Sequence, residues 1–269
     1  VFMNVKANKI ISELDEIDEL FIFPSCGDES LSFGAAWIEY NSIKNKSLNN
    51  IKPSQLKHLY LGRSYDDEEI NTYIKKSKIL NNCKIDKINN IENEIAKLLV
   101  DNNIIARFNG PMEWGARALG NRSIIANPSN WLNVEKINAM IKKRDFWMPF
   151  APSILKEESD LYLCNPKKYI SPYMMLAFET NLQASKEICA AIHPRDKTAR
   201  AQFVDKKTNL SYWKLIDSFR SLTGLPCVLN TSFNLHGYPL VNTPEDAIYV
   251  FINSGLDYLA IGDYLISKT

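Results

Sequence analysis

Short apolar runs alternate with amphipathic segments along most of the chain, and this pattern limits the folds that the chain can adopt. The runs "LFIFP" (20–24), "IIARF" (104–108) and "LPCVLN" (225–230) have the length and composition of buried strands. By contrast, "IENEIAKLLVDNN" (91–103) and "WLNVEKINAMIKKR" (131–144) repeat apolar residues at helical spacing. Because helices and strands alternate without an internal repeat, we predict an α/β (α+β) fold with a mixed sheet flanked by helices.

Helix ends are marked at several places. Thr243 followed by Pro244 is typical of a helix start, because the hydroxyl caps free N–H groups and proline fits the first turn. Gly224 ends the helical pattern of the preceding segment, as glycine commonly does. Nearer the N-terminus, "SLSFGAAWIEY" (30–40) predicts a helix with small residues on its packing face.

A polar stretch at residues 41–57 is the best candidate for a domain boundary. It lacks apolar periodicity and contains a proline. We therefore predict a small unit over 1–45, a linker over 46–59 and a larger unit over 60–269.

Composition limits the classes of function. The formal net charge is only +1, which argues against a broad nucleic-acid footprint. We expect no signal peptide and no membrane span, because no apolar run has the required length. The five scattered cysteines lack CxxC spacing, which indicates free thiols and a cytoplasmic location.

Arginine is scarce and unevenly placed. Lysine supplies most of the positive charge, and four of the eight arginines fall in segments rich in glycine, asparagine or proline: Arg117, Arg122, Arg144 and Arg200. The planar guanidinium binds carboxylate or phosphate through two parallel bonds, which lysine cannot do. This placement predicts an oxyanion site, although arginines that tie loops to carboxylates or carbonyls would give the same pattern.

Four segments carry more polar residues than packing requires. They are "GPMEWGARALGNRS", "KKRDFWMPFAPS", "HPRDKTARAQ" and "LNTSFNLHG". The last follows a predicted strand, where ligands of α/β folds commonly bind, but its asparagines and serine would also suit a turn. The chain contains no P-loop, Rossmann fingerprint, nucleophile elbow or HExxH motif. The four segments together predict a site for a polyanion such as a nucleoside triphosphate, bound without those motifs.

These segments resemble the carbamoyltransferase family of nodulation, cephamycin and aminoglycoside tailoring enzymes. The resemblance covers roughly residues 60–269, and "LGRSYDDEEI" is similar to the start of that family's C-terminal, YrdC-like domain. "VFMNV" and "PSCGDESLSFGAAW" resemble the last segments of its actin-like N-terminal domain, related to tRNA threonylcarbamoyl transferases. The resemblance implies a YrdC-like twisted sheet preceded by a remnant of an actin-like ATPase domain.

The resemblance also implies a two-stage reaction. The YrdC-like domain would form carbamoyl-adenylate from carbamoyl phosphate and ATP with Mg2+, releasing phosphate and pyrophosphate. The actin-like domain, with a divalent metal such as iron, would pass the carbamoyl group to a substrate hydroxyl. Two anionic reactants must be brought together, so fixed cations and backbone donors are expected around them.

The family's motifs assign roles to particular positions. Lys142, Arg200 and Ser232 are the predicted catalytic residues, with Lys142 and Arg200 on carbamoyl phosphate and α-phosphate oxygens. The predicted nucleotide-binding residues are Arg117, Asn121, Arg122, Arg144, Asn230 and Asn234. Asp28 stands where the family has a metal-binding aspartate. His193 and His236 lie in matching segments and either contact ligand or shape turns.

The chain also departs from the family. Met148 stands where many members have arginine, and Ala116 where proline is usual. The histidine pair that would complete a metal site with Asp28 is absent, and the actin-like part is short. We therefore expect a fragment or a subunit of a split enzyme that forms carbamoyl-adenylate at most. A homodimer, or a partner supplying the missing domain, is expected.

Two other functions remain open. A degenerate YrdC-like module could bind nucleotide or RNA without catalysis, although the near-neutral charge argues against RNA. A threonylcarbamoyl-adenylate synthase is the other, but "MEWGARALGNRS" and "SFNLHG" favour the carbamoyltransferases.

Overall fold

A computed structural model of the chain describes residues 1–45, 56–143 and 148–269. Within them, eight strands form one mixed sheet in the order β1-β10-β9-β2-β3-β8-β4-β7. Its strands are β1 (Cys83–Lys87), β2 (Ile105–Phe108), β3 (Arg122–Ala126), β4 (Ala151–Leu155), β7 (Gln202–Val204), β8 (Cys227–Ser232), β9 (Tyr258–Ile261) and β10 (Tyr264–Lys268). A short hairpin pairs β5 (Leu163–Cys164) with β6 (Glu179–Thr180).

The sheet is mixed, as predicted. β2 runs parallel to β9 and β4 parallel to β7, whereas the other neighbours in the sheet are antiparallel. The register places Asn230 opposite Ala151 and Ser232 opposite Ser123. Polar residues at the carboxyl end of β8 therefore lie beside the amino ends of β3 and β4.

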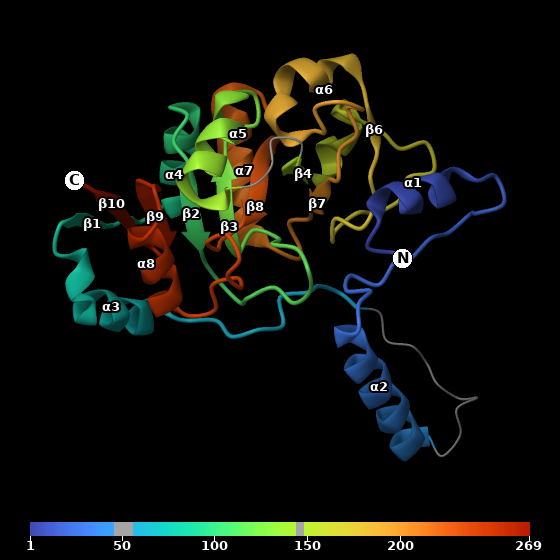
Figure 1. Cartoon of the computed structure of the whole chain (residues 1–269), viewed down its shortest axis with the longest axis horizontal. Helices are drawn as coiled ribbons and strands as arrows, with labels where there is room; N and C mark the ends of the chain where they lie inside the picture. Colours follow the sequence, from blue (N-terminus) through green and yellow to red (C-terminus); the bar gives the residue numbers. More distant parts are fainter. Residues whose placement is uncertain (46–55, 144–147) are drawn as a thin grey trace.

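Helices cover both faces of the sheet (Figure 1). The longer helices are α1 (Val5–Glu13), α2 (Glu29–Asn45), α3 (Asp67–Lys76), α4 (Ile91–Val100), α7 (Leu210–Thr223) and α8 (Pro244–Ile252). The shorter ones are α5 (Leu132–Ile137) and α6 (Leu182–Glu187), with 3-10 turns at Lys78–Leu80, Lys156–Leu161 and Cys189–Ala191 and a π turn at Asn138–Lys142. None of the helices in the described ranges is both long and apolar enough to cross a membrane.

Alternation along the central strands explains the two helical layers. Ile105, Ile125 and Val228 join one core with α4 and α7, while their neighbours Ile124 and Leu229 join a second core with α3, α5 and α8. Successive strand residues point to opposite faces, so a strand buried on both sides must be apolar throughout. The continuous apolar runs of the sequence follow from this arrangement.

The predicted helix ends are confirmed. The Thr243 side chain accepts from the backbone N–H of Asp246, whose own carboxylate accepts from the Thr243 N–H, and Pro244 begins α8. Gly224 ends α7 in the left-handed conformation, with φ of 80°.

Two expectations near the N-terminus fail. "LFIFP" is not a strand, because no strand of the sheet pairs with it among the described residues. The predicted helix over 30–40 exists as α2, but its small-residue face does not pack against the rest of the described chain. α2 projects from the body of the molecule (Figure 1), with Leu31 and Ile43 each 70% exposed. The division into domains and the actin-like origin of this region stay predictions, and residues 46–55 of the proposed linker lie outside the described ranges.

Candidate functional site

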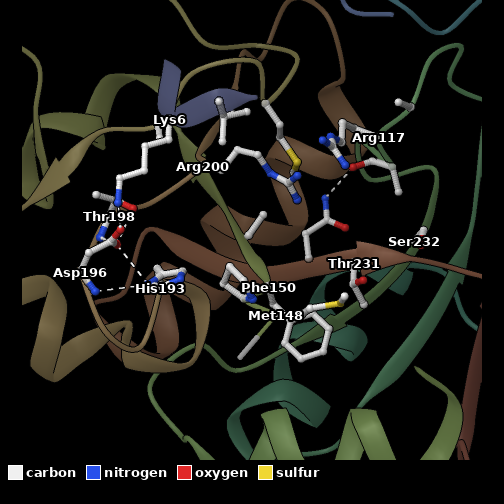
Figure 2. A pocket seen from close by; sticks show the side chains of 18 of the residues that line it. Lys6, Arg117, Met148, Phe150, His193, Asp196, Thr198, Arg200, Thr231 and Ser232 are labelled. Carbon is white, nitrogen blue, oxygen red and sulfur yellow. Dashed lines mark hydrogen bonds and ion pairs between the residues drawn. The ribbon is translucent and has the colours of Figure 1, made fainter. Parts of the chain in front are cut away.

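A cavity of about 1010 Å3 lies where the carboxyl end of β8 meets the amino end of β4 (Figure 2). Four cationic side chains and one carboxylate belong to the described residues that line it: Lys6, Arg117, Arg195, Arg200 and Asp196. The excess of positive charge makes the cavity suitable for an anion of several charges.

Four of the residues predicted from sequence meet at this cavity: Arg117, Arg200, Asn230 and Ser232. In Figure 2, Arg117, Arg200 and Ser232 border the same open space. They come from three segments that are far apart in the sequence. His193 also lines the cavity, whereas Lys142, Asn121, Arg122, Asn234 and His236 are not among its lining residues. Arg144 lies outside the described residues.

Lys142 lies behind Ser232 and holds it in place. Only 2% of Lys142 is exposed, and its Nζ donates to Ser232 Oγ at 3.0 Å and to Asn234 Oδ1 at 2.6 Å. It also donates to the backbone carbonyls of both residues. The Ser232 hydroxyl donates in turn to Asn234 Oδ1 at 2.7 Å. This network fixes the end of β8 and places a buried positive charge next to a cavity-lining hydroxyl.

Arg122 has its contacts inside the protein. It is fully buried, its guanidinium lies 3.6 Å from the centre of the Phe108 ring, and it donates to the carbonyls of Asn109, Gly110 and Asn121. Burial lowers the pKa of Arg122 to about 10, although the nearby carboxylate of Glu113 acts in the opposite direction. In these contacts Arg122 stabilises the loop that carries Arg117.

Glu113 organises the same loop from its other side. Its buried Oε1 accepts from the backbone N–H groups of Leu119 at 2.7 Å, Asn121 at 3.3 Å and Arg122 at 3.2 Å. The Asn121 side chain donates to the Pro111 carbonyl at 2.7 Å. Both Asn121 and Arg122 are therefore engaged within the loop, and their predicted contact with nucleotide stays a prediction.

A second polar cluster closes another part of the cavity. Asp196 Oδ2 accepts from Lys6 Nζ at 2.7 Å, which ties α1 to the cavity wall. Its Oδ1 accepts from the N–H and hydroxyl of Thr198 and lies 3.1 Å from His193 Nδ1. Burial alone would raise the pKa of Asp196, but the hydrogen bonds from Lys6 and Thr198 outweigh it and lower the pKa.

The sequence predictions did not include Lys6, Arg195 or Asp196. Arg195 and Asp196 lie inside the segment "HPRDKTARAQ", so their position next to Arg200 was a usable signal. Lys6 had no local signal, because its contact with Asp196 joins residues 190 positions apart.

The predicted metal contact of Asp28 stays a prediction. Among the described residues, no group of three or more histidine, cysteine, aspartate or glutamate side chains is close enough to hold a metal ion. Asp28 lies immediately before α2, outside the lining of the cavity. The described residues therefore do not fit the divalent metal of a complete actin-like domain.

Comparison with known proteins identifies the family. Residues 96–268 match the family model described as "Carbamoyltransferase C-terminus". The chain belongs to this carbamoyltransferase family. The matched range contains the cavity-lining residues Arg117, Arg200, Asn230 and Ser232.

Three curated relatives are similar to the chain, and the name of one of them states an O-carbamoyltransferase. "Uncharacterized protein MJ1058" of Methanocaldococcus jannaschii is 38% identical over the whole chain, which covers 43% of that protein. "Nodulation protein NolO" of Bradyrhizobium diazoefficiens is 33% identical over 93% of the chain and 45% of its own length. "3'-hydroxymethylcephem-O-carbamoyltransferase" of Amycolatopsis lactamdurans is 29% identical over 63% of the chain and 32% of its own length. The chain thus spans less than half of each of these proteins.

Among solved structures, one titled "Crystal structure of full-length HypF in the phosphate- and nucleotide-bound form" covers 69% of the chain and 22% of its own length. Its TM-score is 0.44 at 14% identity, which is too low to carry an inference about this chain.

Proposed function

We propose that this chain is the carbamoyl-activating part of an O-carbamoyltransferase. Carbamoyl phosphate, ATP and water would give carbamoyl-adenylate, phosphate and pyrophosphate in the cavity beside β8. The carbamoyl group would then pass to a hydroxyl of a small-molecule acceptor. That second step belongs to the longer protein or partner chain of which this segment would form part, where the divalent metal would also be held.

The observation that carries the proposal is the meeting of Arg117, Arg200 and Ser232 around one cavity in a carbamoyltransferase chain. Guanidinium groups fixed on separate segments suit phosphoryl oxygens, because each offers paired donors. Their charges also offset the repulsion between two anionic reactants. The volume of about 1010 Å3 lies at the upper end for small-molecule sites and leaves room for a nucleotide beside a small anion.

The residues around the cavity would divide the work. Arg117 and Arg200 bind phosphoryl oxygens and hold the reactants in line. Ser232 lies at the end of β8 beside the reactants, and its hydroxyl is held by Lys142 and Asn234. Mg2+ accompanies the ATP and neutralises part of the triphosphate charge.

A pyrophosphate-release assay tests this proposal. The chain should release pyrophosphate from ATP only when carbamoyl phosphate is also present. Arg200→Ala should lower kcat/KM by about a hundredfold or more, because a fixed cation on the transferring group is lost. The matched control is Arg220→Ala, which removes an arginine on α7 that pairs with Glu158 and Asp217 outside the cavity.

Full activity in the Arg200→Ala variant would remove that residue from the mechanism. Absence of carbamoyl-phosphate-dependent pyrophosphate release by the unaltered chain would overturn the proposed function. ATP binding without turnover in the same assay would instead support a non-catalytic nucleotide-binding module.

A further inference from the structure

Asn230 is a buried amide of the cavity wall, and its side-chain acceptor is unused. It lies in β8, it is 2% exposed, and it belongs to the residues that line the cavity. Its Nδ2 donates to the Ala118 carbonyl at 3.1 Å and to Ser153 Oγ at 3.0 Å. Its Oδ1 is buried and has no hydrogen-bond partner among the residues that the structure describes. Such unsatisfied buried acceptors are rare in folded proteins and call for a reason.

The orientation of this amide follows from its neighbours. Gln202 Nε2 donates to the Leu119 carbonyl at 2.9 Å, so Gln202 Oε1 faces Ser153. The Ser153 hydroxyl gives its single proton to Gln202 Oε1 at 2.7 Å and must accept from Asn230. The Ala118 carbonyl can also only accept. The Ala118 carbonyl and Ser153 Oγ therefore fix the orientation of Nδ2, and Oδ1 is left without a hydrogen-bond partner among the described residues.

The hydrogen-bond acceptor and the hydrogen-bond donors of the cavity wall suit different groups of a ligand. Arg117 and Arg200 carry only donors, which suit a phosphoryl group. Asn230 Oδ1 can only accept, so it suits an N–H group. Carbamoyl phosphate contains both, a phosphoryl anion and a terminal NH2. Acetyl phosphate has nearly the same shape but carries a methyl group in place of the NH2.

We propose that Asn230 Oδ1 accepts a hydrogen bond from the carbamoyl nitrogen and so selects carbamoyl phosphate over acyl phosphates of the same size. This inference rests on the proposed function, since it assigns a specificity residue to that site. A site built to hydrogen-bond one substrate rejects an analogue that leaves its buried polar group unpaired. The Ala118 carbonyl accepts from Asn230 directly, and the Leu119 carbonyl orients Gln202, which in turn accepts from Ser153. Both carbonyls belong to the loop that carries Arg117.

The test compares two ligands before it compares variants. Binding of carbamoyl phosphate and of acetyl phosphate is measured by titration calorimetry on the unaltered chain, without ATP. We expect carbamoyl phosphate to bind at least about tenfold more tightly, the effect of one hydrogen bond to a buried acceptor. Equal affinities would overturn the inference without any substitution, and would also be the result if an ordered water satisfied Oδ1.

Asn230→Ala should make the two affinities more nearly equal, mainly because carbamoyl phosphate binds more weakly. The matched control is Asn133→Ala, because Asn133 is also a fully buried asparagine whose Nδ2 is bonded and whose Oδ1 lacks a partner among the described residues. It does not line the cavity, so its loss should leave the preference unchanged. Thermal unfolding of both variants shows whether each is folded at the assay temperature.

The outcomes separate this inference from the proposed function. Failure to bind or use carbamoyl phosphate at all would contradict the proposed function. Normal pyrophosphate release with no preference over acetyl phosphate would contradict only the role of Asn230. An Asn230→Ala variant that weakens ATP binding but keeps the preference would assign the acceptor to the adenine amino group instead, and would also overturn the inference.

Discussion

Replacing Glu113 tests how the loop that carries Arg117 is held. The buried carboxylate oxygen accepts from three backbone N–H groups, those of Leu119, Asn121 and Arg122. In Glu113→Ala these donors lose their acceptor, and each unsatisfied buried group costs about 1–3 kcal/mol. Because local relaxation and entry of water recover part of this, we expect a loss of about 3–6 kcal/mol in the free energy of unfolding.

Glu113→Gln separates the hydrogen bonds from the charge. The amide oxygen can still accept from the same donors, but charge-assisted bonds are roughly twice as strong as neutral ones. The loss should therefore be smaller, about 1–2 kcal/mol. Denaturant unfolding measures both variants, with Glu39→Gln on the exposed helix α2 as the control. A loss below about 1 kcal/mol in Glu113→Ala would refute the assigned role of the carboxylate.

Two further predictions concern a glycine and a carboxylate near the site. Gly120 has φ of 110°, and a Cβ there would lie 2.3 Å from the Tyr212 ring, so Gly120→Ala should destabilise the protein by at least about 2 kcal/mol in denaturant unfolding. Gly224→Ala, with φ of 80° and open space, should lose about 1 kcal/mol, and equal losses would contradict the steric explanation. Burial raises the pKa of Asp196, but hydrogen bonds including the one from Lys6 outweigh it, so the folded-state pKa is lowered. Its contribution to stability is then present above the unfolded-state pKa of about 4 and is lost as the pH falls through the folded-state value. Unfolding free energies of Asp196→Asn and the unaltered chain should differ most near neutral pH and converge in acid, and a constant difference would contradict this.

The sequence was most informative where local patterns decide local structure. The spacing of apolar residues and the composition of the segments predicted the mixed α/β fold. The cap residues Thr243 and Gly224 marked helix ends correctly. The run "LFIFP" misled because an apolar stretch of strand length becomes a strand only when another strand pairs with it. Pairing depends on contacts that are distant in sequence.

Predictions for the site were limited because an arginine can either face a ligand or hold a loop together. Arg117 and Arg122 share one motif, yet the first lines the cavity and the second bonds to carbonyls inside the loop. Both uses suit a guanidinium, and the local sequence does not distinguish them. No sequence pattern indicates the unpaired acceptor of Asn230, because it depends on the partners of Nδ2 in other strands and loops.

A crystal structure of the chain soaked with carbamoyl phosphate and a non-hydrolysable ATP analogue would show where the phosphoryl groups bind. We expect phosphoryl density in the cavity beside β8, within hydrogen-bond distance of Arg117 and Arg200. Ligand bound at another surface, with both guanidinium groups left without a phosphoryl contact, would contradict it.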